Sequence, residues 1–218
     1  MIRRLTLPDS GARREGERRI AGSAERNIAA ILDVLGAHAP QDGRALELAS
    51  GTGQQIVRYA QAFPGLDWQP SDIDPDNLVS IRAWAVEHPA PNLREPVLID
   101  AGRPGWEIAL HPFDLIHTVN LLHLISRAEA RTVVAEAALA LAPGGRLVIY
   151  GPFLRDGVAT SEGDARFHAS LRAADPEVGY KDAADVADWL KEAGLSVPEV
   201  AAMPANNLAF VAGRPHEG

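Results

Sequence analysis

Cysteine is absent from the 218 residues of the chain. Disulfide bonds, a thiolate nucleophile and a cysteine-bound metal are therefore excluded. The chain also lacks an excess of positive charge, since its formal net charge is −8. Binding to nucleic acid needs a basic face, so no nucleic-acid partner is expected. The histidines, among them His117 and His123, lack the spacing of metal ligands, and we expect no metal site.

Long apolar runs are missing as well, and the arginine-rich N-terminus has no apolar segment behind it. We therefore predict no membrane span, no secretory signal and a cytoplasmic location. No linker or repeat divides the chain. The prediction is one domain at residues 23–218, preceded by an N-terminal arm at 1–22.

The arm carries six arginines, interrupted by two glutamates: Arg3, Arg4, Arg13, Arg14, Arg18 and Arg19. A charge run of this kind is typical of a solvated tail or a surface helix. The alternative is a lid that closes over an anionic ligand.

Apolar periodicity predicts strands that alternate with helices. The first helix is expected from about Ser23, its cap, to His38. Further helices are expected at 54–63, 74–88, 126–145 and 182–195, and strands at 44–49, 66–71, 95–100, 113–122, 146–151, 196–203 and 207–213. The last two strands are joined too tightly for a crossover, which requires antiparallel pairing. The predicted fold is α/β, a Rossmann-like doubly wound sheet of seven strands with the last strand antiparallel.

The stretch "ALELASGTGQQIV" places small residues directly after the first strand, namely Ala49, Ser50, Gly51 and Gly53. Ligands bind at this edge of such sheets, and small residues let them reach the N–H groups that begin the next helix. Ile56 stands where a dinucleotide fingerprint has its third glycine. The pattern therefore favours a nucleotide-like ligand other than NAD.

Acids lie at the ends of three successive strands. Glu47 precedes the glycine turn and is suited to a cationic group, while Asp72 is placed for ribose hydroxyls and Asp100 for an adenine amine. Asp72 or Asp100 alone could equally cap a turn. Together with the glycines, the three acids predict a cationic nucleoside ligand.

The motifs "LELASGTG", "SDIDPDNL", "LIDA", "FDLIHTVNLLHLI" and "LAPGGRLVIYGPF" resemble, in order, those of class I S-adenosylmethionine (SAM) dependent methyltransferases over residues 44–151. Ala49 is a departure, because the family has its first glycine there. The stretches "SAERN", "WQPSD", "YGPF", "ASLRAADPEVGYKD" and "MPANNL" are similar to a small methyltransferase-like subfamily catalogued as a domain of unknown function, over residues 23–210.

This resemblance implies that S-adenosyl-L-methionine is the cofactor and S-adenosyl-L-homocysteine (SAH) the product. It implies that Glu47 holds the methionine ammonium through the turn and that Arg26 meets the methionine carboxylate. The cofactor residues it implies are Arg26, Asn27, Glu47, Ala49, Ser50, Gly51, Gly53, Asp72, Ile73, Asp100, Ala101 and Asn120. Among these, Ile73 and Ala101 are expected at the adenine, and Asn120 faces the methionine half through its carbonyl.

Methyl transfer in line with a sulfonium depends mainly on positioning, and a base is needed only if the nucleophile must lose a proton. Three candidates for such a catalytic role are His123 and Tyr150, near strand ends, and His168 in an insertion at residues 152–182. His123 could instead be a packing residue. The insertion is interpreted as the substrate wall, or alternatively as a cover of helix and loop. Substrate contacts are expected from Phe153, Tyr180, Asn206 and Asn207.

The function predicted from these residues is in-line methyl transfer from SAM to a small-molecule substrate by a monomer or homodimer. A second hypothesis is a protein of the same fold that uses the cofactor's charge for a reaction other than methylation. A third is a binding protein without turnover. Detection of SAH as a product with candidate substrates separates the first hypothesis from the third.

Overall fold

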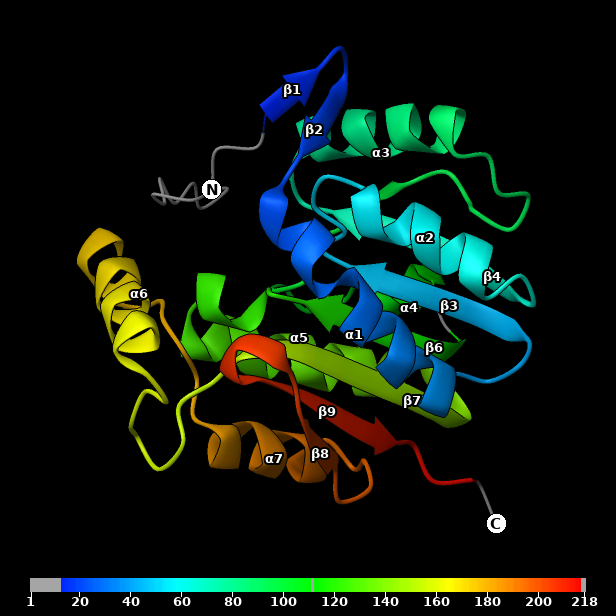
Figure 1. Ribbon diagram of the computed structural model, residues 1–218. Coiled ribbons are helices and arrows are strands. Elements are labelled where there is room, and N and C mark those ends of the chain that lie inside the picture. Colours follow the sequence, from blue (N-terminus) through cyan, green and yellow to red (C-terminus); the bar gives the residue numbers. More distant parts are fainter. Residues whose placement is uncertain (1–12, 111, 217–218) are drawn as a thin grey trace.

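A computed structural model describes residues 13–110 and 112–216 of the chain. Its centre is a sheet of seven strands in the order β5-β4-β3-β6-β7-β9-β8 (Figure 1). The bounds are β3 Gly43–Leu48, β4 Leu66–Asp72, β5 Val97–Leu98, β6 Phe113–Val119, β7 Leu141–Pro152, β8 Glu199–Ala202 and β9 Asn207–Gly213. Neighbouring strands from β5 to β7 are parallel, whereas β9 is antiparallel to both β7 and β8. The predicted doubly wound sheet with an antiparallel last strand is confirmed.

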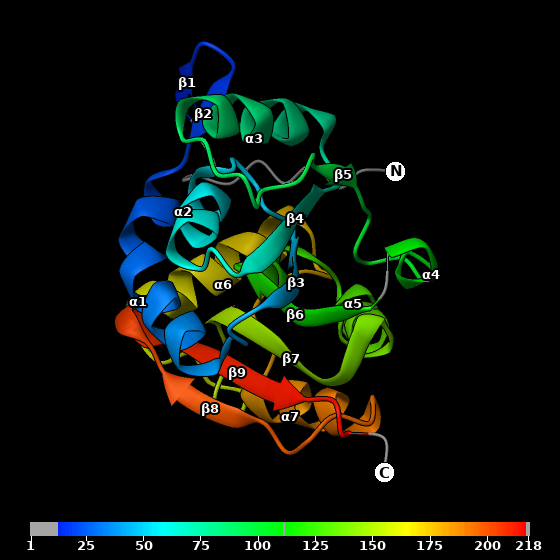
Figure 2. The same cartoon turned by 90° about the vertical axis from the view of Figure 1, so that its right-hand side faces the viewer.

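Helices cover both faces of this sheet. Figure 2 shows the strands between α1 and α2 on one side and α5 on the other. The first layer contains α1 Gly22–His38, α2 Gln54–Ala62 and α3 Pro75–Glu87, and the second contains α4 Glu107–Leu110, α5 Arg127–Ala140 and α7 Ala183–Glu192. Helix α6, Glu162–Ala174, lies outside both layers, beyond the carboxyl ends of the parallel strands (Figure 1). Two short 3-10 helices, η1 Leu122–Leu124 and η2 Pro204–Asn206, follow strands β6 and β8.

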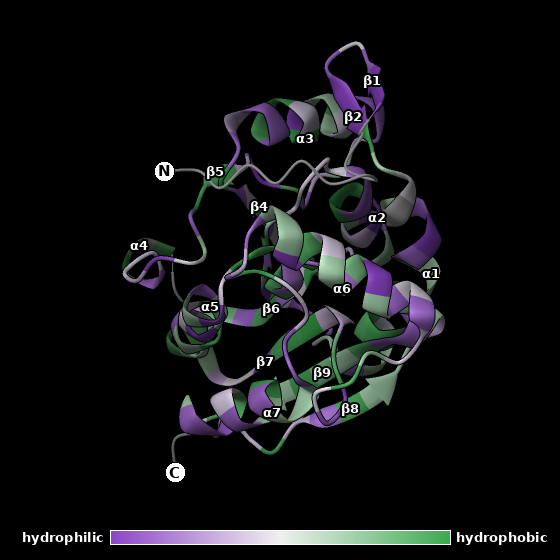
Figure 3. Ribbon diagram, turned by 90° about the vertical axis from the view of Figure 1, so that its left-hand side faces the viewer, coloured by the Kyte–Doolittle hydropathy of each residue, from purple (hydrophilic) through white to green (hydrophobic). Residues whose placement is uncertain are grey.

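The core is divided by the sheet into two apolar clusters. Successive side chains of a strand point to opposite faces, so Leu46 and Leu48 of β3 pack with α5 and α7, while Ala45 packs with α1, α2 and α3. All three are fully buried. The hydropathy colouring of Figure 3 shows the strands mostly apolar between more polar outer helices. Burial on both faces explains why these strands read as continuous apolar runs.

Three predicted boundaries are wrong. Helix α1 begins at Gly22 with Ala21 as N-cap, so Ser23 is not the cap. Helix α5 ends at Ala140, and the Pro143–Gly145 stretch expected at its end lies within β7. Proline excludes the residue before it from helical backbone, which explains the early stop. The third predicted strand shrinks to the two residues of β5.

The N-terminal arm, as far as it is described, is a hairpin and not a tail or surface helix. Strands β1, Arg13–Glu15, and β2, Arg18–Ile20, pair in antiparallel fashion and lie against α3. Arg14 pairs with Asp76 at 3.0 Å, and Arg18 with Glu87 at 2.7 Å. The arginines of this hairpin therefore dock it onto an acidic helix. Residues 1–12, with Arg3 and Arg4, lie outside the described residues.

Within residues 13–110 and 112–216, no helix has the length and apolar character that crossing a membrane would demand.

Candidate functional site

A cavity of about 430 Å³ opens at the carboxyl ends of the parallel strands, beside the glycine turn. Every residue that lines it falls between Ala21 and Glu129: Ala21, Ala24, Ala49, Ser50, Gly51, Thr52, Gln55, Asp72, Ile73, Asn77, Ile99, Asp100, Ala101, Gly102, Val119, Asn120, Leu121, Leu124, Ile125 and Glu129. Eight of the predicted cofactor residues are among them. A volume of this size is within the range of pockets that hold drug-sized ligands.

The turn after β3 is left-handed at three positions, with φ of 58° at Ala49, 59° at Gly51 and 89° at Gly53. A Cβ added at Gly53 would lie 2.7 Å from Cα of Ile81 on α3. At Gly51 a Cβ would meet nothing within 4 Å, because that side of the residue faces the cavity. Gly53 thus permits close packing of α2 against α3, and Gly51 leaves room for a ligand.

Asp72 ends β4 and ties the turn to the next helix. Its carboxylate accepts hydrogen bonds from the backbone N–H of Gly51 at 2.8 Å and of Asp74 at 2.9 Å. The Asn77 side chain also bonds to it, and all three bonds lower the pKa of Asp72, but burial outweighs them and the net direction is upward. A carboxylate has about four acceptor sites, so Asp72 retains capacity for hydroxyl donors in the cavity.

Glu47 lies behind the turn and does not line the cavity. It is 2% exposed, and burial raises its pKa to about 8. Its Oε1 lies 3.8 Å from Nε2 of His117, whose pKa burial lowers to about 3. Glu47 Oε2, His117 Nε2 and the hydroxyl of neighbouring Tyr59 are all buried and have no hydrogen-bond partner among the described residues. A buried carboxyl with an unused oxygen next to the glycine turn fits a cationic group.

The adenine-side predictions also lie at the cavity. Asp100 bonds to the N–H of Gly102 at 3.2 Å and pairs with Arg103 at 3.2 Å, and Ala101 beside it is buried. On the other wall, Asn120 has a left-handed φ of 57°, and its N–H donates to the carbonyl of Tyr150 at 2.8 Å. Asp100 and Asn120 thus stand on opposite walls of one space.

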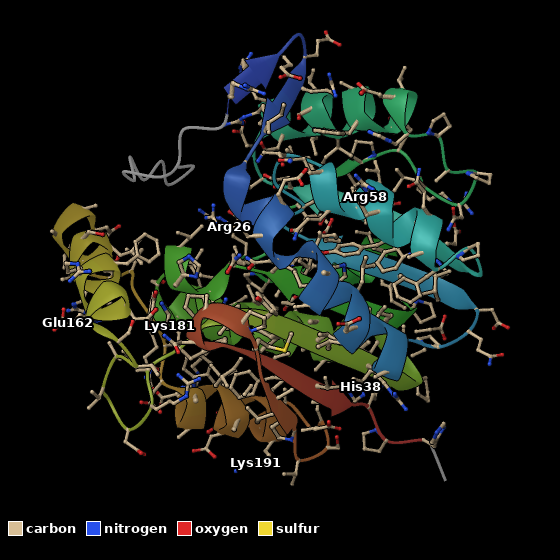
Figure 4. All side chains as sticks on the ribbon, viewed as in Figure 1. Arg26, His38, Arg58, Glu162, Lys181 and Lys191 are labelled. Carbon is tan, nitrogen blue, oxygen red and sulfur yellow. The ribbon has the colours of Figure 1, made fainter. Side chains whose placement is uncertain are left out.

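Four predicted cofactor residues are not part of the lining, namely Arg26, Asn27, Glu47 and Gly53. Arg26 is exposed and extends from α1 on the side of the molecule where α6 lies (Figure 4). Among the described residues, no ion pair or hydrogen bond of its side chain is found. Arg26 is therefore placed outside the cavity lining.

Polar side chains from three elements meet beyond the cavity. The amide of Asn207 donates to the Tyr150 hydroxyl at 3.2 Å, and this hydroxyl donates to Oδ1 of Asn27 at 3.4 Å. Tyr150 is buried, and burial raises its pKa. The chain Asn207–Tyr150–Asn27 joins β9, β7 and α1, and it brings two predicted substrate-side residues next to a predicted cofactor residue.

The two histidine candidates are packed into the cover and do not line the cavity. His123 on η1 is 6% exposed and makes edge contacts with the rings of Phe167 and Tyr180. Burial, reinforced by Lys181, lowers its pKa to about 3. His168 on α6 accepts a hydrogen bond from the N–H of Tyr180 at its Nδ1, at 3.0 Å. The ring contacts of His123 are those of a packing residue, which is the alternative that its sequence position allowed.

The other residues predicted to contact the substrate lie in different parts of the structure. Phe153 is buried against Phe210 with ring centroids 5.0 Å apart, so it belongs to the core. Tyr180 donates through its hydroxyl to Asp164 of α6 at 3.2 Å. Asn206 also donates to Asp164, at 3.0 Å. Tyr180 and Asn206 thus fasten α6 to the body, and of the four predicted substrate residues only Asn207 reaches the polar chain.

Sequence reasoning missed much of the lining. The apolar wall of Ile99, Leu121, Leu124 and Ile125 follows strand ends, and that position is a signal that could have identified it. The small residues Ala21 and Ala24 at the start of α1 gave no such signal. No group of three metal-ligating side chains occurs within 13–110 and 112–216.

Comparison with known proteins identifies a family for this chain and solved structures with a similar fold. A family model described as "Protein of unknown function (DUF938)" matches residues 18–214. An O-methyltransferase family protein from Burkholderia thailandensis aligns with 90% of this chain and 59% of its own, at 18% identity and a TM-score of 0.76. The SAM-dependent methyltransferase SibL in its apo form aligns with 89% of this chain and 57% of its own, at 22% identity and a TM-score of 0.71.

A third solved structure is the SAH-bound form of CalO1, a methyltransferase in calicheamicin biosynthesis. It aligns with 89% of this chain and 55% of its own, at 17% identity and a TM-score of 0.68. The chain thus spans less than two thirds of the length of these three proteins. It has the class I methyltransferase fold, as the sequence motifs predicted.

Proposed function

The chain belongs to the family described as a protein of unknown function (DUF938), and on that premise we propose that it is a SAM-dependent methyltransferase for a small molecule. The observation that carries this proposal is the joint placement of glycines and acids around one cavity. Gly51 leaves room for a ligand, while Asp72 and Asp100 line the walls and the carboxyl of Glu47 lies behind the turn.

The cofactor fits the residues present. The bound SAM would supply an electrophilic methyl group on a sulfonium, and its ammonium adds a second cationic centre. Glu47 provides the buried acid for the ammonium end, and Asp72 has acceptor capacity for ribose hydroxyls. Ile73 and Ile99 line the cavity beside Asp100 and offer apolar surface to the adenine.

The residues of this chain would act chiefly by positioning. Holding a nucleophile about 3 Å from the reacting carbon supplies roughly 7–11 kcal/mol of a barrier. We take the Asn207–Tyr150–Asn27 chain, which lies outside the cavity lining, as the polar group that orients the substrate. His123 is neutral at pH 7 and a poor proton acceptor, because burial lowers its pKa to about 3. The arrangement favours a nucleophile that needs no strong base.

The cover favours a substrate of small size. Helix α6 lies beyond the strand ends and is tied to η2 by Asp164 and Asn206. The formal net charge of −8 also disfavours nucleic acid as the methyl acceptor.

Binding of SAH to the purified protein tests the cofactor assignment. We expect the wild type to bind SAH and Asp72→Asn to bind it about 10- to 100-fold more weakly, because one charged hydrogen-bond acceptor contributes about 1.5–3 kcal/mol. Gly51 and Asp74 bond to different oxygens of Asp72, so Asp72→Asn keeps only one of these two backbone bonds, and its melting temperature is measured beside its affinity. Calorimetric titration measures both, with Asp76→Asn, exposed on the first turn of α3, as the matched control. Unchanged affinity in Asp72→Asn would contradict the assignment.

Replacement of Tyr150 separates substrate from cofactor. We expect Tyr150→Phe to lower turnover about tenfold or more and to change SAH affinity less than twofold, since the hydroxyl contacts Asn27 and Asn207 and lies outside the cavity lining. Release of SAH with a panel of small nucleophiles gives turnover, and calorimetry gives affinity. Equal losses in both would move Tyr150 into the cofactor site. Tight SAH binding without product from any acceptor would favour the hypothesis of a binding protein.

A further inference from the structure

The hairpin of β1 and β2 ends on the cofactor side of α3. At its last strand, Arg19 is anchored three times. Its backbone N–H donates to Oγ of Ser80 at 2.8 Å, its carbonyl accepts from Nε1 of Trp84 at 3.0 Å, and its guanidinium pairs with Asp74 at 3.0 Å. The Arg19 side chain is only 26% exposed. The end of the hairpin is therefore held against α3 at Arg19.

The residues that hold Arg19 also contact the glycine turn or Asp72. The Ser80 hydroxyl in turn donates a hydrogen bond to the carbonyl of Thr52, in the glycine turn, at 2.7 Å. The same guanidinium nitrogen that meets Asp74 donates to Oδ1 of Asn77 at 2.7 Å. Both Asp74 and Asn77 bond to Asp72, the former through its N–H at 2.9 Å and the latter through its side chain.

The amide of Asn77 has one orientation that satisfies both neighbours. Its oxygen accepts from Arg19, so its nitrogen is the group that donates to the carboxylate of Asp72. The guanidinium holds the amide oxygen and the carboxylate of Asp72 holds the amide nitrogen, so loss of Arg19 removes one of two restraints on the Asn77 side chain.

The positive charge of Arg19 also supports a positioning role. Asp74 is negative and close enough to Asp72 to raise its pKa. Arg19 balances that charge from the outer side, at a partly buried position where an ion pair is screened less than on the open surface. Arg19 thus balances the acid next to Asp72 without touching Asp72 itself.

We propose that Arg19 is a positioning residue for the ribose end of the cofactor site, and that the β1–β2 hairpin is a built-in strap that holds Asp72 through Asp74 and Asn77. This inference rests on the proposed function, because it takes the ligand of Asp72 to be the ribose of SAM. It gives the basic arm a role other than a lid over an anionic ligand.

The test compares two variants and two ligands. We expect Arg19→Ala to weaken SAH binding about tenfold in calorimetric titration. Arg14→Ala removes the exposed ion pair to Asp76 on the same hairpin and is expected to leave affinity unchanged within twofold. The 2′-deoxy analogue of SAH lacks one ribose hydroxyl. Because the effect of Arg19 passes through Asp72, we expect Arg19→Ala to weaken the analogue at most threefold.

Each outcome bears on one claim. If the wild type fails to bind SAH, the proposed function is wrong. If the wild type binds SAH and Arg19→Ala binds it equally well, the positioning role is overturned while the proposed function stands. Equal weakening of both ligands would also overturn it, since a general loosening of the fold would have that effect. Arg19→Lys keeps a cation that can reach Asp74 or Asn77, and partial recovery of SAH affinity is expected from it.

Discussion

Gly53→Ala is expected to lower the melting temperature by about 4–20 °C and to abolish measurable SAH binding. Two costs add here. An L-residue at a φ of 89° costs about 1–2 kcal/mol, and a Cβ 2.7 Å from the Ile81 backbone forces α2 and α3 apart, which costs about 1–3 kcal/mol. For a chain of this size each kcal/mol shifts the melting temperature by about 2–4 °C. The displaced turn would also break the bond from Gly51 to Asp72.

Gly51→Ala is the matched control for this experiment. It has a comparable left-handed φ of 59° but open space around the added Cβ. Only the backbone cost remains, so we expect its melting temperature, measured without ligand, to fall by about 2–8 °C and by less than that of Gly53→Ala. Equal destabilisation by the two substitutions would contradict the close approach of α2 and α3. Scanning calorimetry and denaturant unfolding provide the measurements.

Glu47→Gln is expected to remove a strong pH dependence of stability. The pKa of Glu47 is raised by burial from 4.5 to about 8, so the folded state binds a proton that the unfolded state has lost between these pH values. The stabilisation is fully present below pH 4.5 and is lost as the pH rises to 8, at up to ~1.4 kcal/mol per unit. Relative to Glu47→Gln, the wild type should lose about 3–5 kcal/mol of unfolding free energy across this window.

The difference between the two proteins isolates Glu47. His117 and His123, whose pKa values are lowered to about 3, give the opposite slope between pH 3 and 6.5, and both proteins contain them. Urea unfolding at pH 5, 6, 7 and 8 measures the difference. A constant difference across that range would show that the buried carboxyl does not titrate there.

The same variant separates stability from binding. A cationic ammonium at Glu47 requires the ionised carboxylate, so wild-type SAH affinity should rise from pH 6 to pH 7.5, by up to tenfold per unit. Glu47→Gln should bind SAH weakly and without this rise. A variant that is more stable at pH 8 and yet binds less would be the expected signature of an acid kept buried for its ligand. Unchanged affinity in Glu47→Gln would remove Glu47 from the cofactor site.

Sequence reasoning succeeded where local chemistry and periodicity point the same way. The glycine turn and the acids Asp72 and Asp100 follow strand ends, and parallel strands bring such positions to one edge. The position of the cavity, though not most of its lining, was therefore predictable from the order of its elements. The helix expected at residues 74–88 is also present as α3, and Asp74 caps it by accepting from the N–H of Asp76 at 3.0 Å.

Tertiary contacts decided the features that were missed. Nothing near Phe153 in the sequence indicates that it packs on Phe210, more than fifty residues later. Likewise, the arginines of the arm resembled a solvated charge run, because their acidic partners lie on α3, far along the chain. His123 and Asn206 follow strand ends as predicted, but their side chains are engaged by the 152–182 segment, whose fold had no periodic signal.

All residues that line the cavity precede residue 130, whereas α6, α7 and the η2 turn come later. The cavity wall thus comes from the chain up to the start of α5, and the cover comes from the elements after it. Mutations after it can reshape the cover, including the polar latch at Asp164, while the cavity wall stays intact. The β6–β7 ladder joins the two parts, because Leu115 to Val119 pair with Arg146 to Tyr150. Backbone groups make this ladder, which does not depend on side-chain identity, so substitutions in α6 and η2 are the ones expected to change the methyl acceptor.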